Sequence, residues 1–318
     1  MLMHVEKANA VVEEIKKAVI GKDDCINKIM MAILSRGHIL IEDIPGVGKT
    51  TLALAFSKVM NLNQSRVQFT PDILPSDILG FSVYQKESGK FVYQEGPIMC
   101  NLFLADEINR TSPKTQSALL EVMEEGKVTV DGVTRIVPKP FIVMATQNPV
   151  GSSGTQKLPE SQLDRFLICM SMGYPDIQSE IMIAKERSSS NPIDTLVPVI
   201  DAKELEAMQN EVDNIFVHDI VFEYIANLSI ATRKEVLFEL GVSPRGTIAL
   251  TRTAKARAFL LNRDYVIPED VYKVFNDVAA HRVHISSKAL MLQMTVNDIL
   301  ADILKQVRKP EQHILNMR

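Results

Sequence analysis

The stretch Asp43-Ile-Pro-Gly-Val-Gly-Lys-Thr50 lies between an apolar run, residues 38–42, and a helix-like stretch, residues 51–60. A glycine-rich loop that follows a strand and opens a helix is the context of the Walker A motif, in which backbone N–H groups surround phosphate oxygens. The alternative is a glycine-rich turn that binds nothing. The strand–loop–helix context favours the phosphate-binding interpretation.

Each residue type in this loop has a chemical task. Gly46 and Gly48 let the backbone N–H groups point inward at phosphate oxygens. Lys49 is expected to reach the β- and γ-phosphates, and Thr50 to present its hydroxyl to Mg²⁺. The strict motif opens with glycine, whereas this one opens with Asp43. Aspartate tolerates turn conformations better than most residues, so the motif survives the departure.

The composition is that of an ordinary globular protein with room for two domains. The 318 residues are 46% hydrophobic and 23% charged, with a formal net charge of −4. Neither half of the chain has a basic excess, which argues against duplex nucleic acid as a ligand. No apolar run approaches the roughly 20 residues that span a membrane, and we see no signal peptide. Three scattered cysteines, Cys25, Cys100 and Cys169, fit neither a metal motif nor a disulfide framework and suit a reducing cytoplasm.

Short apolar runs alternate with helical patterns in the first part of the chain. Near-continuous apolar runs suit strands that are buried on both faces of a parallel sheet, so the pattern predicts an α/β domain with crossover helices. Two hairpins are predicted as well, one in the region 70–100 with Gly89 in its turn and one at 127–137. The apolar runs are residues 38–42, 66–70, 101–106, 141–146 and 165–172.

After residue 175 the sequence reads as helices only. We therefore predict a boundary there, with residues 1–175 forming the α/β core and residues 176–318 an all-helical domain. A polar loop is expected at 188–198. The predicted helices span residues 176–189, 202–213, 218–232, 245–261, 268–280 and 287–307.

The run Leu102-Phe-Leu-Ala-Asp-Glu107 is an apolar strand that ends in two acids. Asp106 is placed to hold Mg²⁺, directly or through water. Glu107 is placed to polarise an attacking water. Taken alone, two acids at a strand end are equally well explained as solvated surface groups. Downstream of a phosphate-binding loop, they favour a Walker B motif.

Three further polar residues have both a functional and a structural interpretation. Asn148 follows the apolar run 141–146 and is placed either to orient the lytic water or touch the γ-phosphate, or to cap a turn before a proline. Arg165 is either an arginine finger for a neighbouring subunit's γ-phosphate or half of a surface ion pair. Arg245 is expected in the first turn of a helix, where a cation faces the positive end of the dipole. That placement suggests an external phosphate, and Arg245 can reach the nucleotide of its own subunit if the helical domain folds over it. The alternative is an exposed arginine.

His281 and His284 could share one helix face as metal ligands, but no third ligand is suggested nearby. We therefore interpret them as core or surface histidines. No Ser-His-Asp or Cys-His pairing stands out at a recognisable spacing.

Six stretches, taken in this order, resemble the MoxR family of AAA+ ATPases. The resemblance runs from about residue 10 to about residue 310, and Asp43 is a departure that this family accepts. The stretches are DIPGVGKTTLA (43–53), RVQFTPDILPSDILG (66–80), LADEINR (104–110), ATQNP (145–149), LPESQLDRF (158–166) and GVSPRG (241–246).

The resemblance implies more than the residues alone do. It implies a five-stranded αβα core followed by a helical lid, with region 70–100 as an insert in the second helix and 127–137 as a hairpin before the sensor strand. It gives Asn148 the sensor 1 role, Arg165 the finger role and Arg245 the sensor 2 role toward ATP and Mg²⁺. With the loop motif, it extends the expected nucleotide contacts to Val19, Ile20, Gly21, Pro45, Val47 and Thr51.

Members of this family typically form hexameric rings and act as chaperone-like remodellers of protein clients or as metal-insertion helpers, often beside a partner with a von Willebrand A domain. The alternative is the motor subunit of a magnesium-chelatase-like complex, which the same motifs fit. A DNA motor is disfavoured by the missing basic patch. A non-hydrolysing binding module is disfavoured because Glu107, Asn148 and Arg165 occur together.

Overall fold

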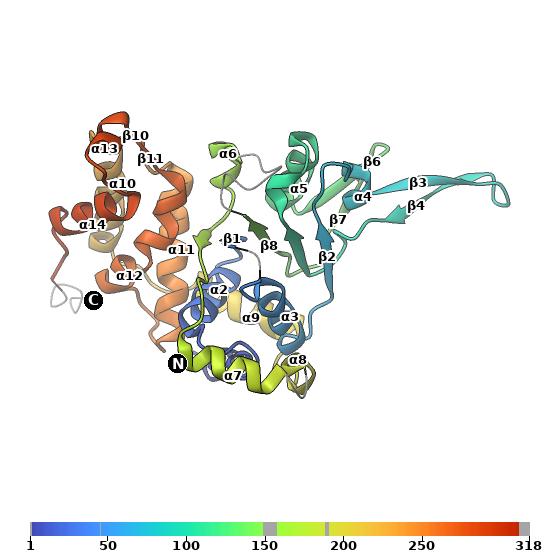
Figure 1. Ribbon diagram of the computed structural model, residues 1–318, viewed down its shortest axis with the longest axis horizontal. Helices are drawn as coiled ribbons and strands as arrows, with labels where there is room; N and C mark the ends of the chain where they lie inside the picture. Colours follow the sequence, from blue (N-terminus) through green and yellow to red (C-terminus); the bar gives the residue numbers. More distant parts are fainter. Residues whose placement is uncertain (1, 45, 149–157, 188–190, 312–318) are drawn as a thin grey trace.

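A five-stranded parallel sheet forms the centre of the computed structural model (Figure 1). Its strands are β1 (Ile39–Glu42), β2 (Gln64–Gln68), β5 (Leu102–Asp106), β8 (Ile142–Gln147) and β9 (Ile168–Met170). They lie in the order β2-β5-β8-β1-β9, and each neighbouring pair is parallel. Every strand overlaps one of the five apolar runs, so the predicted α/β sheet is confirmed. The structure describes residues 2–44, 46–148, 158–187 and 191–311.

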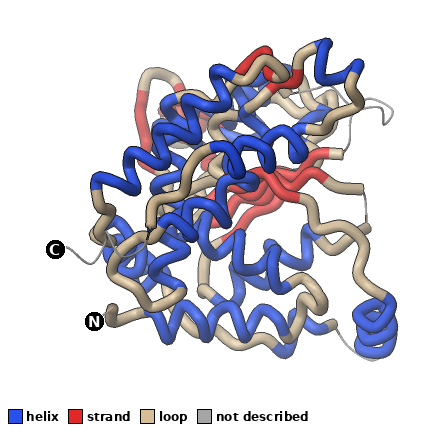
Figure 2. The backbone as a smooth tube through the Cα atoms, turned by 90° about the vertical axis from the view of Figure 1, so that its left-hand side faces the viewer, coloured by secondary structure: helices blue, strands red, loops and turns tan. Residues whose placement is uncertain are grey.

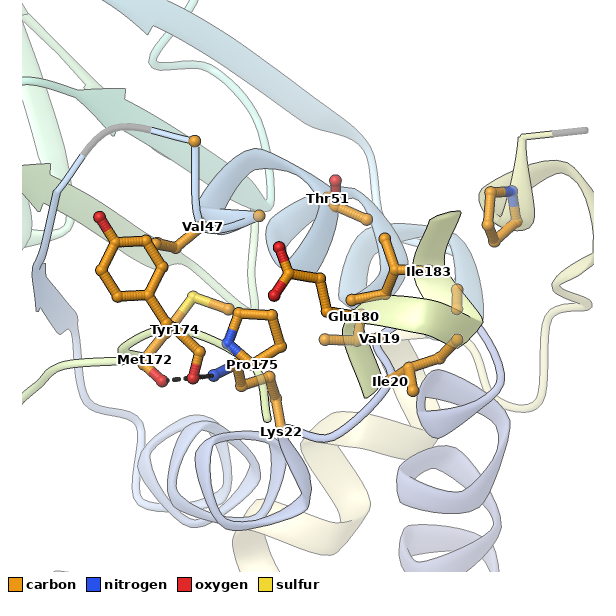
Figure 3. A pocket seen from close by; sticks show the side chains of 14 residues that line it. Val19, Ile20, Lys22, Val47, Thr51, Met172, Tyr174, Pro175, Glu180 and Ile183 are labelled. Carbon is orange, nitrogen blue, oxygen red and sulfur yellow. Dashed lines mark hydrogen bonds between the residues drawn. The ribbon is translucent and has the colours of Figure 1, made fainter. Parts of the chain in front are cut away.

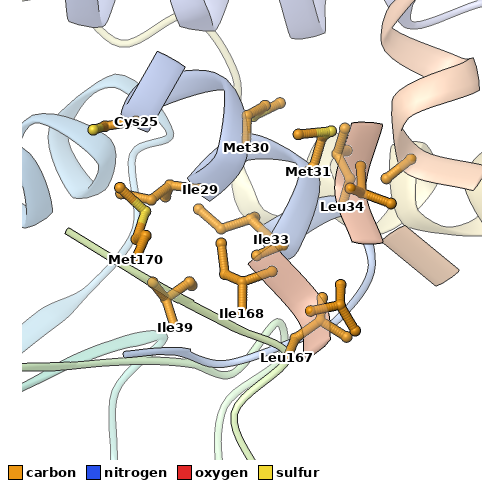
Figure 4. Close-up of a cluster of buried hydrophobic side chains, with 14 of the residues drawn as sticks. Cys25, Ile29, Met30, Met31, Ile33, Leu34, Ile39, Leu167, Ile168 and Met170 are labelled. Carbon is orange, nitrogen blue, oxygen red and sulfur yellow. The ribbon is translucent and has the colours of Figure 1, made fainter. Parts of the chain in front are cut away.

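Helices cover both faces of this sheet. Successive side chains of a strand point to opposite faces, so Ile39 and Ile41 of β1 pack in one hydrophobic cluster and Leu40 in another. The first cluster includes α1, α2 and α3, and Figure 4 shows Ile33 of α2 beside Ile168 of β9. The second includes α5. The helices of this part are α1 (Val5–Lys16), α2 (Asp23–Leu34), α3 (Lys49–Val59), α4 (Pro75–Leu79), η1 (Ile108–Arg110), α5 (Pro113–Glu125) and α6 (Glu160–Leu163).

Two antiparallel hairpins interrupt the alternation of strands and helices. Strand β3 (Gly80–Gln85) pairs with β4 (Lys90–Glu95), and β6 (Lys127–Val130) pairs with β7 (Val133–Ile136). Gly89 has a φ of +65° at the turn of the first hairpin, as the sequence predicts. This hairpin projects far from the sheet (Figure 1). Both predicted hairpins are thereby confirmed.

The rest of the chain is mainly helical, with one correction. Strands β10 (Phe238–Leu240) and β11 (His284–Ile285) form a small antiparallel sheet where only helices were predicted. Strands of three and two residues are too short to show a period of two in the sequence. The helices are α7 (Ile177–Arg187), α8 (Pro192–Thr195), α9 (Ala202–Asp213), α10 (Asp219–Lys234), α11 (Pro244–Leu260), α12 (Pro268–Ala279), η2 (Ala280–Arg282), α13 (Ser287–Met291) and α14 (Val296–Gln306).

Two details of the helical prediction are also corrected. The single helix expected at 287–307 is divided into α13 and α14, because Gln293 has a φ of +54° and Thr295 caps the start of α14. Thr295 accepts a hydrogen bond from the backbone N–H of Asp298, and the Asp298 carboxylate accepts one from the backbone N–H of Thr295. This capping box is a strong helix start. The expected loop at 188–198 contains the short helix α8.

Helix α9 packs against the N-terminal helices. Gln209 donates a hydrogen bond to the carbonyl of Ile33 at 2.7 Å, and Arg36 donates to the side chain of Gln209 at 2.8 Å. Helix α11 packs against α2, α9 and α12. One hydrophobic cluster therefore continues from the sheet into the C-terminal helices, and Figure 2 shows the strands enclosed among them. Within the described residues, no helix has the length and apolar character needed to cross a membrane.

Candidate active site

The predicted phosphate-binding loop connects β1 to α3. Gly46 and Gly48 have φ values of +88° and +95°, which lie in the left-handed region that favours glycine. A Cβ atom on either glycine would meet no other atom within 4 Å, so the backbone conformation and not a lack of space requires glycine. Helix α3 begins at Lys49, and its free N–H groups suit a phosphate. Pro45, another predicted contact, lies outside the described residues.

A pocket of about 280 Å³ lies beside this loop (Figure 3). Six of the predicted nucleotide contacts line it: Val19, Ile20, Gly46, Val47, Gly48 and Thr51. Sequence reasoning missed further lining residues because they come from motif-free segments around α2, β9 and α7. These include Lys22, Met172, Tyr174, Pro175, Glu180 and Ile183.

Gly21 serves this pocket indirectly. Its φ is +71°, and a Cβ at this position would lie 2.2 Å from Oγ of Ser179. Glycine at this position therefore lets α7 approach closely, which brings Glu180 and Ile183 to the pocket wall. The predicted contact of Gly21 with the nucleotide stays a prediction.

Asp43 ties the start of the loop to the segment that follows β9. One carboxylate oxygen accepts hydrogen bonds from the Ser171 hydroxyl at 2.9 Å and from the N–H groups of Met172 and Gly173, both at 2.7 Å. Burial raises the pKa of Asp43, but these hydrogen bonds outweigh it and leave the pKa below its ordinary value. The aspartate that departs from the strict motif is thus a structural anchor, which glycine cannot be.

Lys22 holds the same segment from the opposite side. Its ammonium group donates to the carbonyls of Met172 at 2.7 Å and of Gly173 and Tyr174 at 3.0 Å. The strip between β9 and α7 is therefore held by a carboxylate and an ammonium group together. Tyr174 lines the pocket from this strip, so the wall beside the loop is preorganised.

Lys49 is buried at the start of α3, where its ammonium group donates to the carbonyl of Asp43 at 2.7 Å. Burial lowers the pKa of Lys49, while the charges of Asp43, Asp106 and Glu107 act in the opposite direction. The ammonium group is therefore partly desolvated, and its described partner is a neutral carbonyl. A charged phosphate is a stronger acceptor than a carbonyl and can replace it.

Asp106 lies at the end of β5 with both carboxylate oxygens engaged. Thr146 donates to one at 2.5 Å, and Arg66 donates to the other at 2.7 Å. Arg66 stands on the neighbouring strand β2 in register with Leu104. Sequence reasoning missed Arg66 and Thr146, although each lies inside a stretch that resembles the family.

Glu107 and Asn148 meet, as their predicted roles require. The Asn148 amide donates to Glu107 at 3.0 Å, and Arg110 donates to the second carboxylate oxygen at 2.7 Å. The hydrogen bond from Arg110 and that from Asn148 lower the pKa of Glu107 against the effect of burial, so the carboxylate is ionised near neutral pH. Among the residues that the structure describes, the buried Oδ1 of Asn148 accepts no hydrogen bond. It is therefore free to accept one from a water.

Arg165 and Arg245 lie together, apart from the loop. Arg165 donates to Glu124 at 3.0 Å, and Arg245 donates to the other oxygen of the same carboxylate. Burial raises the pKa of Glu124, and the two arginines more than offset it. All three residues line a second cavity of about 470 Å³. The lining of the 280 Å³ pocket, as described, does not include Arg245.

Comparison with known proteins agrees with this geometry. A family model described as "ATPase family associated with various cellular activities (AAA)" matches residues 38–168, and an "AAA lid domain" model matches residues 230–303. Chaperone MoxR1 of Mycobacterium tuberculosis is 37% identical over 94% of this chain and 81% of its own. YeaC of Bacillus subtilis is 47% identical over 95% of this chain and 94% of its own. This chain belongs to the MoxR family of AAA+ ATPases.

A solved structure supports the same assignment and the fold. The crystal structure of a Cytophaga hutchinsonii protein superposes with a TM-score of 0.90 and 36% identity, over 97% of this chain and 96% of that one. The magnesium-chelatase subunit ChlI of Nicotiana tabacum is only 27% identical over 57% of this chain. The protein is therefore an ATP-hydrolysing AAA+ enzyme of the MoxR type, with a helical lid.

The donors at the MoxR-family site fit Mg²⁺. The Asp106 carboxylate and the Thr50 hydroxyl are hard oxygen ligands, which Mg²⁺ prefers alongside substrate phosphates and water. Nowhere in the described ranges do three or more His, Cys, Asp or Glu side chains form a cluster that could hold a metal. His281 and His284 belong to no such cluster, and their side chains contact the segment before β9 instead.

Proposed function

We propose that the protein is a Mg²⁺-dependent ATPase that works as a ring, with each active site completed by the neighbouring subunit. One observation carries the proposal: the phosphate-binding loop borders one pocket, while Arg165 and Arg245 border another. The hydrogen bonds described for the two arginines go to Glu124 and Ser161 and not to the loop of the same subunit. We infer that both act on a neighbour's nucleotide, although the sequence favours the nucleotide of the same subunit for Arg245. A ring can place the two arginines of one subunit beside the nucleotide of the next. The expected ring has six subunits, the number typical of the family.

Within one subunit, the loop and the two carboxylates have separate tasks. Lys49 would bind the β- and γ-phosphates, and Thr50 and Asp106 would hold Mg²⁺, which would supply positive charge against the phosphates. Glu107 accepts a proton from the attacking water. The free Oδ1 of Asn148 accepts a hydrogen bond from the same water and fixes its orientation. This division of labour supports in-line attack on the γ-phosphate.

Arg165 and Arg245 act on the nucleotide of the neighbour. In the isolated subunit both are paired with the half-exposed Glu124, and ion pairs at the surface are weak. A γ-phosphate carries more charge than a carboxylate, so it can displace Glu124 from both arginines. Because Arg165 belongs to residues 1–175 and Arg245 to residues 176–318, the nucleotide state would set the angle between the proposed core and lid.

The work done by this cycle is the remodelling of protein clients in the cytoplasm. The relative named chaperone MoxR1 supports a client of this class. A von Willebrand A domain protein is a candidate partner, and metal insertion into the client is a candidate outcome. A Glu107→Gln variant, which keeps the shape of the site and loses the base, would hold MgATP and retain clients for identification in a pull-down.

The test of a shared active site is a mixing experiment. Lys49→Ala removes the phosphate-binding cation and Arg165→Ala removes the finger, so each variant alone should be inactive. We expect Arg165→Ala to bind ATP nearly as the wild type does, and to hydrolyse it about 10³–10⁵ times more slowly. Mixing the two should restore part of the activity, because an intact loop can then meet an intact Arg165. Full activity of Arg165→Ala alone, or no gain on mixing, would exclude a shared site.

A further inference from the structure

A buried arginine of the lid forms hydrogen bonds with the segment that contains Arg165. Arg282 is 5% exposed. Its guanidinium donates to the carboxylate of Asp164 at 2.8 Å, to the carbonyl of Leu167 at 3.1 Å and to the carbonyl of Phe166. These three partners surround position 165 in the chain. Ser243, at the start of α11, donates to the other carboxylate oxygen of Asp164 at 2.9 Å.

The residues on either side of Arg282 reinforce this contact. The His281 ring nitrogen lies 3.1 Å from the carbonyl of Phe166, and the His284 ring nitrogen lies 3.1 Å from the carboxylate of Glu160. Three of the four side chains in 281–284 therefore touch residues 160–167. The sequence favours core or surface histidines at these positions, and the structure shows that both contact the segment before β9.

The space around Arg282 is built for it. A Cβ atom on Gly246, in the first turn of α11, would lie 2.8 Å from Cδ of Arg282, so glycine lets the arginine pass. A buried guanidinium is expensive unless every donor is satisfied, and an apolar side chain usually stabilises a core as well or better. The guanidinium of Arg282 instead fixes the orientation of its partners, because its hydrogen-bond donors form a planar and rigid fork.

We propose that Arg282 is a positioning residue for the arginine finger: it couples the lid of a subunit to the Arg165 that the same subunit offers to its neighbour. The inference rests on the proposed function of Arg165. Among the described residues, Arg165 itself donates to Glu124 at 3.0 Å and to the carbonyl of Ser161 at 2.8 Å, and both contacts lie near the surface. The contacts of Arg282 with Asp164, Phe166 and Leu167, called the clamp below, therefore decide where the guanidinium of Arg165 points. A lid movement transmitted through Arg282 moves the finger.

The test variant is Arg282→Gln, which keeps a polar side chain, although a shorter one, and loses the charged fork of donors. A misplacement of about 1 Å at a catalytic group costs on the order of 100-fold. We expect kcat to fall roughly 10- to 100-fold, with the ATP dissociation constant unchanged, because the phosphate-binding loop is untouched. The double variant Arg165→Ala/Arg282→Gln should be no slower than Arg165→Ala alone, since the clamp acts through the finger.

Mixing identifies the side of the interface that is damaged. Arg282→Gln should regain activity with Lys49→Ala, which supplies an intact finger to an intact loop. It should gain nothing with Arg165→Ala, because both subunits then offer a defective finger. A general loss of stability, or damage to the loop, would not produce this pattern.

The matched control is Arg263→Gln. Arg263 is another lid arginine that is bound to a buried carboxylate, with both nitrogens within 2.7 Å of Asp270, and it contacts none of residues 160–167 through those bonds. It should lower the melting temperature and leave kcat near that of the wild type. If Arg282→Gln does not fold, Asp164→Asn serves instead, because it weakens the same clamp while keeping its volume, and the same mixing pattern is expected.

The outcomes separate the two proposals. If Arg165→Ala is slow while Arg282→Gln and Asp164→Asn keep the wild-type kcat, the clamp has no positioning role and the shared active site stands. If Arg282→Gln is rescued by Arg165→Ala and not by Lys49→Ala, the lesion lies on the nucleotide side and the inference is wrong. If Arg165→Ala is fully active, the proposed function itself fails.

Discussion

Asp43 is a residue whose chemistry is explained by contacts that are distant in the sequence. A local interpretation treats it as a tolerated substitute for glycine in a turn. In the folded chain its carboxylate is the acceptor for three donors between residues 171 and 173, and for the N–H of Ile44 at 2.8 Å. The position therefore connects the loop to the pocket wall.

We predict that Asp43→Gly weakens the protein although it restores the strict motif. Hydrogen bonds to a charged group contribute about 1.5–3 kcal/mol each, so losing several should cost on the order of 3 kcal/mol of unfolding free energy. ATP affinity should fall as well, because the strip that carries Tyr174 loses one of its two anchors. Chemical unfolding and ATP titration check this.

Asp43→Asn is the graded control for this substitution. An amide keeps the size and one acceptor oxygen but loses the charge, so its effects should lie between those of the wild type and Asp43→Gly. A glycine variant as stable as the wild type, with equal ATP affinity, would reduce Asp43 to a turn residue.

At the scale of elements, the β3–β4 hairpin stands out as structurally separable. Its large side chains are exposed, with Phe91 at 73% and Tyr84 at 53%. Its base is narrow: a Cβ on Gly96 would lie 2.3 Å from the nitrogen of Gly80. The chain could thus be closed at the base without moving α4 or β5.

We predict that replacing residues 83–92 by a short glycine linker leaves the fold, ATP binding and ring assembly intact. This replacement keeps the part-buried Tyr93, whose hydroxyl donates to the carbonyl of Leu79. The reason is that the hairpin contributes little to either hydrophobic cluster. The exposed aromatic side chains would be lost, so any client contact made there would weaken. Melting temperature, ATP titration and sedimentation check the first part; a fall of more than about 5 °C in melting temperature would show that the hairpin is a structural element after all.

The residues of the proposed active site lie on two different parts of each subunit. The loop, Asp106 and Glu107 lie at the carboxyl ends of the strands, whereas the arginine pair lies beside Glu124 near the junction with α11. The hydrogen bonds described for the two arginines go to Glu124 and Ser161, and none goes to the loop, Asp106 or Glu107. Assembly is therefore expected to limit activity.

We predict that ATP turnover per subunit rises with protein concentration and reaches a plateau once the ring is formed. Turnover and sedimentation measured over the same concentration series should change together. The Lys49→Ala variant is expected to assemble, but it lacks the ammonium group that binds phosphate. It therefore provides the background rate. A constant turnover per subunit from the monomer upward would contradict the shared site.

Local sequence was sufficient to predict the elements that are defined by residues adjacent in the chain. The Walker A loop needs glycine at two positive φ values and a helix start directly after it, and all three lie within eight residues. The apolar runs of β5 and β8 are buried throughout, so they are visible without knowing their partners. The α/β class and both hairpins follow from such patterns.

Only the tertiary structure decided which side chains meet. Arg66 reaches Asp106 because β2 and β5 are neighbours in a particular register, and no spacing in the sequence encodes that pairing. The meeting of Arg165 and Arg245 at Glu124 likewise joins three separate segments. His281, Arg282 and His284, which carry no catalytic motif in the sequence, contact the segment that contains Arg165. Sequence determines each local conformation, whereas the packing of helices on the sheet determines which polar groups share a buried space.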